Sequence, residues 1–180
     1  MLPILIIGVV LGYVYKIFER LSAKSADILG KRYFLSAIIA ALILGVLGTI
    51  FPLAMFFGEE EIAKLGNTYL EYTPIMLLAI TLAKVLLINI CINLRWRGGS
   101  FFPSIFAGVC LGYACATLFG IDIAFVVSIS TASVMTTIMR KPLAVSVLLL
   151  LCFPVSNIIY VLAAAFVSSA VPMPKALSKN

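Results

Sequence analysis

The chain has 180 residues, of which 63% are hydrophobic and 11% are charged, and its formal net charge is +6. So few charged residues could not cover a water-soluble globule of this size, and we therefore expect an integral membrane protein surrounded by lipid. The basic excess lies in short clusters between apolar runs, which indicates membrane topology and gives no sign of a nucleic-acid partner.

Histidine and cysteine limit the chemistry that the chain can perform. Histidine is absent, and this excludes a Ser-His triad, a histidine-ligated metal and the usual proton shuttle. We therefore expect no enzyme, no metal site and no cofactor. The four cysteines all lie in apolar runs without metal-ligand spacing, so buried thiols are favoured over disulfides or zinc: Cys91, Cys110, Cys115 and Cys152.

The first apolar segment covers residues 2–18. We expect a membrane span here rather than a signal peptide, because no basic stretch precedes it and no small-residue cleavage pattern is present. Gly8 and Gly12 predict a smooth helix face that packs against another helix. Residues 16–32 then carry five basic and two acidic side chains, which places this end of the span on the cytoplasmic side.

A second apolar run covers residues 33–57, and Pro52 is expected to bend or end it. The run is long enough to cross the ~30 Å hydrocarbon core of a bilayer. Glu59, Glu60 and Glu61 follow. A cation site is one interpretation of three carboxylates, but consecutive side chains on a helix point in different directions, so a solvated helix start is favoured.

A third apolar helix is predicted from Pro74 to about Leu94, with Lys84 in its middle. A charge at this depth costs ~3 kcal/mol on insertion scales. Lys84 either lends positive potential to an anion path or has a supporting role, in which it reaches the interface along its stem or pairs with a carboxylate in a part of the complex outside this chain. The supporting role is favoured. Asn89 and Asn93, four residues apart, are expected to bond to neighbouring helices.

Trp96 lies between Arg95 and Arg97. An aromatic ring between two cations is typical of an anchor at the membrane interface, here towards the cytoplasm. The alternative is that the two arginines attract anions through their local field, which would weaken with salt.

The most specific stretch runs from Arg97 to Gly120 and begins Arg-Gly-Gly-Ser-Phe-Phe-Pro. Gly98 and Gly99 are expected to release the backbone, and Pro103 suits the first turn of a helix, where its missing N–H would be unbonded anyway. The first N–H groups of a helix lack an intrahelical acceptor, and the peptide dipoles add about half a positive charge there. We therefore predict an anion site without basic ligands at a helix start inside the membrane.

Three more helices are predicted after this one. Residues 123–139 are rich in serine and threonine, so most of that helix should be buried in protein. The apolar stretch beyond Arg140 and Lys141 is interrupted by Pro154, and two short helices, 142–153 and 155–171, are expected. Short, proline-broken helices are typical of transporters that bind ions at helix ends. The tail from Pro172 is polar and basic, as expected of a cytoplasmic end.

The segment Gly99-Ser100-Phe101-Phe102-Pro103 resembles the G-x-F-x-P motif of the CLC family of chloride channels and proton-coupled chloride antiporters. Gly108 and Gly112 match that family's small-residue spacing, and the order of apolar segments is similar to the second half of a CLC subunit. The resemblance implies an all-α, polytopic membrane helix bundle with short, broken and tilted helices, in one transmembrane domain over residues 1–180. It also implies a multi-pass protein, with the cytoplasmic membrane as its expected location.

By this resemblance, chloride is the transported ligand and backbone amides bind it. The amides concerned are those of Gly99, Ser100, Phe101 and Phe102, with Ser100 and Phe101 foremost. Structural roles in the motif fall to Gly98, Pro103, Gly108 and Gly112.

The resemblance also implies that the pore is incomplete. CLC subunits contain two inverted repeats and are dimeric with a pore in each subunit, so a first-half repeat and a second copy of the chain are the expected partners. The glutamates that separate channels from antiporters belong to the first repeat, and no tyrosine follows the last predicted helix.

The alternative function is a non-conducting membrane fragment or assembly partner that retains the half-fold. A cation or metabolite carrier is disfavoured, because the apolar runs contain no carboxylates at mid-membrane.

Overall fold

The computed structural model describes residues 1–30, 32–55, 58–94, 96 and 98–174. Within these ranges the chain is built from helices and contains no strand, so the predicted all-α fold is confirmed. The α-helices are α1 (Leu2–Leu29), α2 (Tyr33–Ile50), α3 (Glu59–Thr68), α4 (Pro74–Asn93), α5 (Phe101–Phe119), α6 (Ile123–Met139), α7 (Pro142–Cys152) and α8 (Ile158–Ala170). Short 3-10 turns cover Pro52–Ala54, Tyr69–Glu71 and Val155–Asn157.

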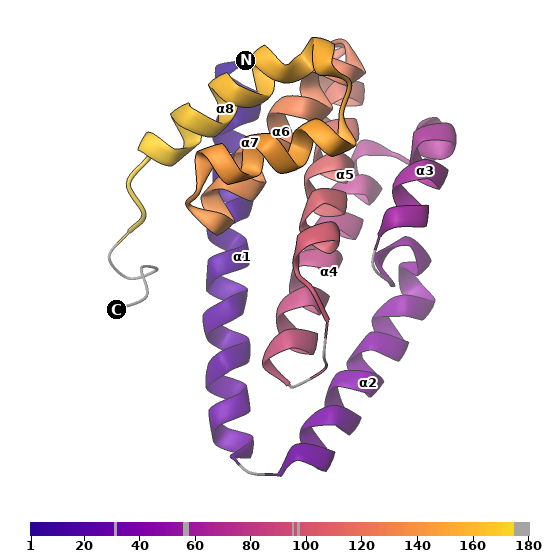
Figure 1. Cartoon of the computed structure of the whole chain (residues 1–180). Coiled ribbons are helices and arrows are strands. Elements are labelled where there is room, and N and C mark those ends of the chain that lie inside the picture. The colour runs from indigo at the N-terminus through magenta and orange to yellow at the C-terminus, as the bar shows by residue number, and fades with distance from the viewer. Residues whose placement is uncertain (31, 56–57, 95, 97, 175–180) are drawn as a thin grey trace.

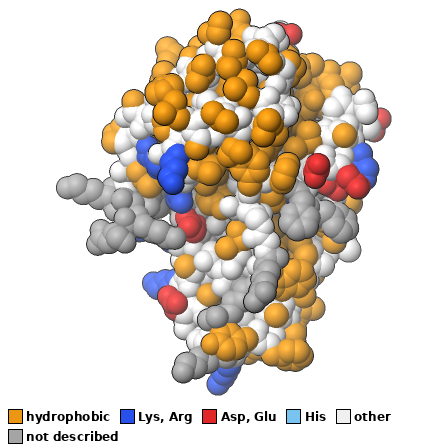
Figure 2. All heavy atoms as spheres, viewed as in Figure 1, with side chains coloured by type: hydrophobic (Ala, Val, Ile, Leu, Met, Phe, Trp, Pro, Cys, Tyr) orange, Lys and Arg blue, Asp and Glu red, His pale blue; other side chains and the backbone are white. Residues whose placement is uncertain are grey.

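Four of these helices, α1, α2, α4 and α5, are long and apolar enough to cross a membrane. The later helices α6, α7 and α8 are apolar but shorter. In Figure 2 hydrophobic side chains cover much of the visible surface, and charged side chains are confined to small groups. The described chain therefore has the surface of a membrane helix bundle.

The ends of the first two helices follow from the residues that stop them. The helix α1 extends well beyond residue 18, the predicted end of the apolar segment, because residues 19–29 contain neither proline nor glycine. It stops before Gly30, whose φ of +57° is readily adopted only by glycine. The end of α2 at Ile50, two residues before Pro52, confirms the predicted break; residues 56 and 57, the end of that predicted run, lie outside the described residues.

The helices α5 and α6 pack against each other more extensively than any other pair of described helices. A Cβ atom added at Gly108 would lie 2.7 Å from the Cα atom of Thr131, and one at Gly112 would lie 2.6 Å from the Cα atom of Val127. Because backbone atoms are the obstacle, only glycine fits at these two positions without moving a helix. This close contact fixes the axis of α5, and therefore the place where α5 begins.

Hydroxyl groups of α6 connect it to its neighbours on both sides. Ser130 donates a hydrogen bond to the Gly108 carbonyl at 2.8 Å, and Ser133 donates to the Leu5 carbonyl of α1 at 2.9 Å. The predicted burial of the serine- and threonine-rich helix is confirmed, since the following side chains are all buried: Ser128, Ser130, Thr131, Ser133, Thr136 and Thr137. The predicted smooth face of α1 is confirmed too, because Gly8 packs on Ser133 and Gly12 on Thr137.

The outer helices are packed less closely. Figure 1 shows α1 and α2 joined by a turn and diverging from it, with α4 between them. The helices α7 and α8 cross the opposite end of the bundle (Figure 1).

The prediction of buried thiols holds for Cys110 and Cys115, but Cys91 is only partly buried and Cys152 is exposed. For Cys152 the prediction was wrong, because α7 is covered by protein on one side only.

Candidate functional site

The first turn of α5 leaves backbone N–H groups without acceptors. The first hydrogen bond of the helical ladder runs from the Ser104 N–H to the Ser100 carbonyl, at 3.1 Å. The N–H groups of Phe101 and Phe102 precede it, and Pro103 has none to bond. Among the described residues, no backbone or side-chain acceptor binds the N–H of Ser100, Phe101 or Phe102. Such N–H groups, together with the helix dipole, form an environment that favours an anion.

The residues just before α5 are open to their surroundings. Gly98 and Gly99 are exposed, Ser100 and Phe101 are partly buried, and Phe102 is 40% exposed. Gly99 does not have a positive φ, and a Cβ added there would meet no atom within 4 Å. The expected use of glycine's backbone freedom is therefore wrong for Gly99. What its missing side chain provides is free space beside the amides.

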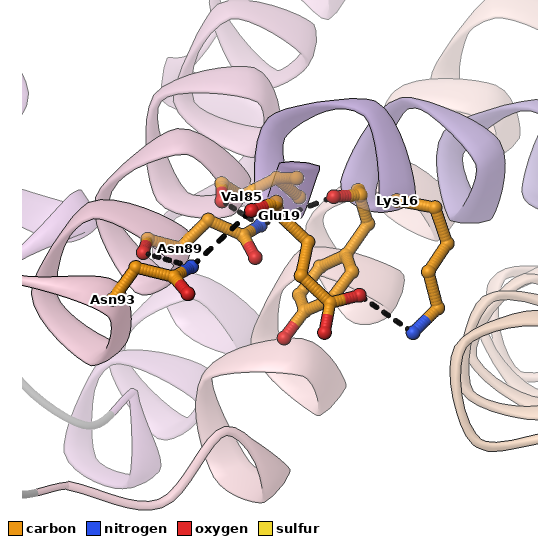
Figure 3. Close-up of polar contacts among 6 residues, drawn as sticks. Lys16, Glu19, Val85, Asn89 and Asn93 are labelled. Carbon is orange, nitrogen blue, oxygen red and sulfur yellow. Dashed lines mark hydrogen bonds and ion pairs between the residues drawn. The ribbon is translucent and has the colours of Figure 1, made fainter. Parts of the chain in front are cut away.

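The helix α1 also reaches this place. The hydroxyl of Tyr15, a buried residue of α1, interacts with the side chain of Ser100. Asn89 and Asn93 of α4 hold α1 in position, as the close-up in Figure 3 shows. The Asn89 side chain donates to the Tyr15 carbonyl at 3.3 Å, and the Asn93 side chain donates to the Glu19 carbonyl at 3.4 Å. The prediction that the two asparagines bond to a neighbouring helix is thus confirmed.

A cavity of about 400 Å³ adjoins the same loop. Its wall is formed by α2, the turn at Pro52–Ala54, α4 and the segment before α5. Most of the lining is apolar, and the described residues that line it are Leu44, Ala54, Met55, Lys84, Leu87, Ile88, Cys91, Ile92, Trp96, Gly98, Gly99 and Pro103. The cavity therefore brings the buried lysine of α4 and the glycines of the anion motif to one space.

Lys84 is held inside the bundle by several contacts. Its side chain is 1% exposed, and its Nζ donates to the Met55 carbonyl at 2.6 Å. The Nζ also lies 4.9 Å from the centre of the Phe106 ring, a cation–π arrangement. Glu61 of α3 is near enough to act on Lys84 electrostatically. Lys84 is buried within the bundle, so the predicted reach of its stem to the membrane interface was wrong. The pairing with a carboxylate outside this chain stays a prediction.

Comparison with known proteins identifies the family. The model of the voltage gated chloride channel family matches residues 1–172. This chain belongs to that family. A search of curated proteins gave no match. Membership in the voltage gated chloride channel family makes the chain an integral membrane protein of a class that moves chloride, not a class of enzymes.

The geometry brings together most of the residues that the CLC motif singles out. Gly99, Ser100, Phe101 and Phe102 are consecutive at the start of α5, and Pro103 is in its first turn, as predicted. Gly108 and Gly112 lie one and two turns further on and face α6. Arg95 and Arg97 lie outside the described residues. Trp96 donates its indole N–H to the Ala37 carbonyl of α2 at 3.3 Å, so it connects the segment between α4 and α5 to α2 in this CLC chain.

Two residues near the site were missed by the sequence analysis. Tyr15 was not singled out, although it lies three residues after Gly12, on the helix face already expected to pack. Glu61 was expected to be solvated with Glu59 and Glu60, but it is only 7% exposed. The signal for Glu61 was its position four residues before Leu65, which is fully buried and shares its helix face.

Proposed function

We propose that this chain contributes to chloride transport by binding the anion at the first turn of α5. The amides of Ser100 and Phe101 are the principal donors, and those of Gly99 and Phe102 lie beside them. The observation that carries the proposal is that none of the N–H groups of residues 100–102 has an acceptor among the described residues. An unbonded N–H at this depth is costly unless a ligand satisfies it.

A complete pore requires donors on the other side of the ion. A single helix start offers only a few N–H groups, and a chloride ion that leaves water needs its hydration replaced all round. The exposure of Gly98, Gly99 and Phe102 leaves room for a second protein surface. We infer that residues 1–180 act as one domain, the second of two repeats, and that a first CLC repeat faces α5. We also infer a multi-pass chain in the cytoplasmic membrane that pairs with a second copy, as either a channel or an antiporter.

The test removes one donor at a time. Ser100 has a φ of −86°, near the value of about −65° that proline requires, and the preceding Gly99 has no Cβ to clash with the proline ring. Ser100→Pro therefore deletes one N–H with little strain. Hydrogen bonds to ions contribute about 1.5–3 kcal/mol, so halide affinity should fall about 10- to 150-fold. The matched control, Ser100→Ala, removes the hydroxyl but keeps the N–H, and it should retain most of the affinity.

The measurement is chloride flux and halide affinity in liposomes that contain the chain together with a first CLC repeat. The chain alone is expected to give no flux. If Ser100→Pro and Ser100→Ala assemble normally and behave alike, the amide does not bind the ion. Chloride-selective flux from the chain alone would show that copies of it form a complete pore.

The second candidate is a non-conducting assembly partner that keeps the CLC half-fold. It is favoured by the close α5–α6 contact, which gives Gly108 and Gly112 a purely structural purpose. It predicts that Ser100→Pro leaves every anion measurement unchanged.

A further inference from the structure

The cavity between α2 and α4 is continuous with the anion motif. Gly98, Gly99 and Pro103 form part of its wall, and Ser100 and Phe101 lie between them in the sequence. Its volume of about 400 Å³ is many times that of one water molecule, about 30 Å³, so an anion could enter with part of its hydration shell. An ion held here would be one short step from the proposed amide donors.

The wall of this cavity carries positive charge at Lys84. Lys84 is the charged residue among the described residues that line the cavity. The other side chains of the lining are apolar, so little solvent screens the field of the ammonium group. The hydrogen bond to Met55 and the Phe106 ring hold the group at the wall without neutralising it. An anion in the cavity therefore gains from the field of Lys84, which Glu61 of α3 reduces.

We propose that this cavity is a second binding position for a small monovalent anion, with Lys84 as the residue that attracts the anion. The ligand class is a halide or a similar inorganic anion. The inference rests on the proposed function for the destination of the ion, which is the first turn of α5, but the cavity can be tested by itself. It gives Lys84 a role in the path in addition to its structural contacts.

Glu61 allows a test of the direction in which charge changes the attraction for anions. It acts on Lys84 from α3 and is not among the described residues that line the cavity, so it lowers the positive potential there without contacting an ion. Neutralising Glu61 should therefore strengthen the attraction for anions, whereas neutralising Lys84 should weaken it. A residue pair with only a structural role would give no such opposite responses.

Cys91 is a suitable probe, because it lines the cavity and lies two helical turns after Lys84 on α4. The other thiols are removed as Cys110→Ala, Cys115→Ala and Cys152→Ala. The full chain is then treated with two methanethiosulfonate reagents, the anionic sulfonatoethyl compound and the cationic trimethylammonioethyl compound. The ratio of their rates reports the local potential, and a change in thiolate fraction cancels because both reagents attack the same thiolate.

Lys84→Met should lower the anion-to-cation rate ratio about tenfold or more, since one charge acts with opposite sign on the two reagents. Lys84→Arg should leave the ratio unchanged, and Glu61→Gln should raise it. The Glu61→Gln variant keeps Lys84 in place and gives an answer even if Lys84→Met folds poorly. An equal ratio in the parent, Glu61→Gln and any folded Lys84→Met would overturn the proposal.

Crystals of the full chain assembled with a first CLC repeat, grown in bromide, locate the ion directly by anomalous scattering. A bromide peak in the cavity supports the second position, and no peak there overturns it. A cavity peak without one at Ser100 and Phe101 would instead contradict the proposed function and leave the cavity site in place. The two ideas can therefore fail separately.

Discussion

The α5–α6 contact and the α2–α4 side of the molecule are packed in opposite ways. At α5 and α6, glycines bring two backbones together, and hydroxyl groups bridge the helices. At α2 and α4, the helices diverge around a cavity that holds a buried cation. The anion motif begins where these two regions meet. The comparison teaches that close packing on one side fixes the start of α5, while the other side leaves a cavity beside the proposed anion site.

The largest effect is expected from closing the gap between α5 and α6. In Gly108→Ala the new methyl group meets the Thr131 Cα atom at 2.7 Å, and a backbone atom cannot move aside as a side chain can. We expect a loss of about 1–3 kcal/mol in the free energy of unfolding, measured in detergent. Gly99→Ala is the control, because nothing lies within 4 Å of its Cβ position; its effect should stay within about 0.5 kcal/mol. Equal effects would remove the contrast between the two regions.

A smaller effect is expected from the hydroxyl groups of α6. The Thr131 hydroxyl is buried and has no hydrogen-bond partner among the described residues. Thr131→Val keeps the shape of the side chain and removes this unbonded group, so it should stabilise the fold by about 1 kcal/mol.

Ser133 is the matched case on the same helix. It donates to the Leu5 carbonyl and accepts a hydrogen bond from Ser168 at 3.0 Å. Ser133→Ala should therefore destabilise the fold by about 0.6 kcal/mol for each bond lost. Thermal unfolding of both variants checks the signs, and a loss of stability in Thr131→Val would mean that its hydroxyl has a partner after all.

The smallest effect concerns the two faces of α4. Asn89 faces α1, and Asn89→Leu removes its bond to the Tyr15 carbonyl, for an expected loss of about 0.6 kcal/mol. Ile92 lines the cavity and is 39% exposed, so Ile92→Ala should change the stability by less. Denaturant titrations of both variants test this order. The reverse order would show that the cavity side, not the α1 side, holds α4 in place.

Most of the helices could be predicted because their ends are set by local chemistry. The helix α6 has the bounds that the sequence predicted, residues 123–139. Asp122 caps its first turn by accepting a hydrogen bond from the Phe125 N–H, and the chain turns at Arg140, where φ is positive. The end of α2 followed from Pro52 alone. The apolar run marks only residues 2–18, whereas α1 continues to Leu29, because a helix ends only where a residue breaks it.

The surroundings of the site could be predicted only in part, since they come from distant segments. The motif itself marked Ser100 and Phe101. Nothing in the sequence near Lys84 indicates that its partner is the Met55 carbonyl, 29 residues earlier. Tyr15 meets Ser100 only because Asn89 and Asn93 hold α1 against α4. Such contacts depend on how whole helices pack, which local patterns do not specify.

The hydrogen bond from Ser133 to Leu5 joins residues 128 positions apart. During synthesis α1 therefore leaves the ribosome long before α6, the helix that will bury its glycine face, has been made. Until then the face of α1 that carries Gly8 and Gly12 lacks its partner helix, although Asn89 and Asn93 of α4 already bond to α1. The helix α1 reaches its final packing only when α6 enters the membrane, so a segment that is made later decides whether α1 is placed correctly.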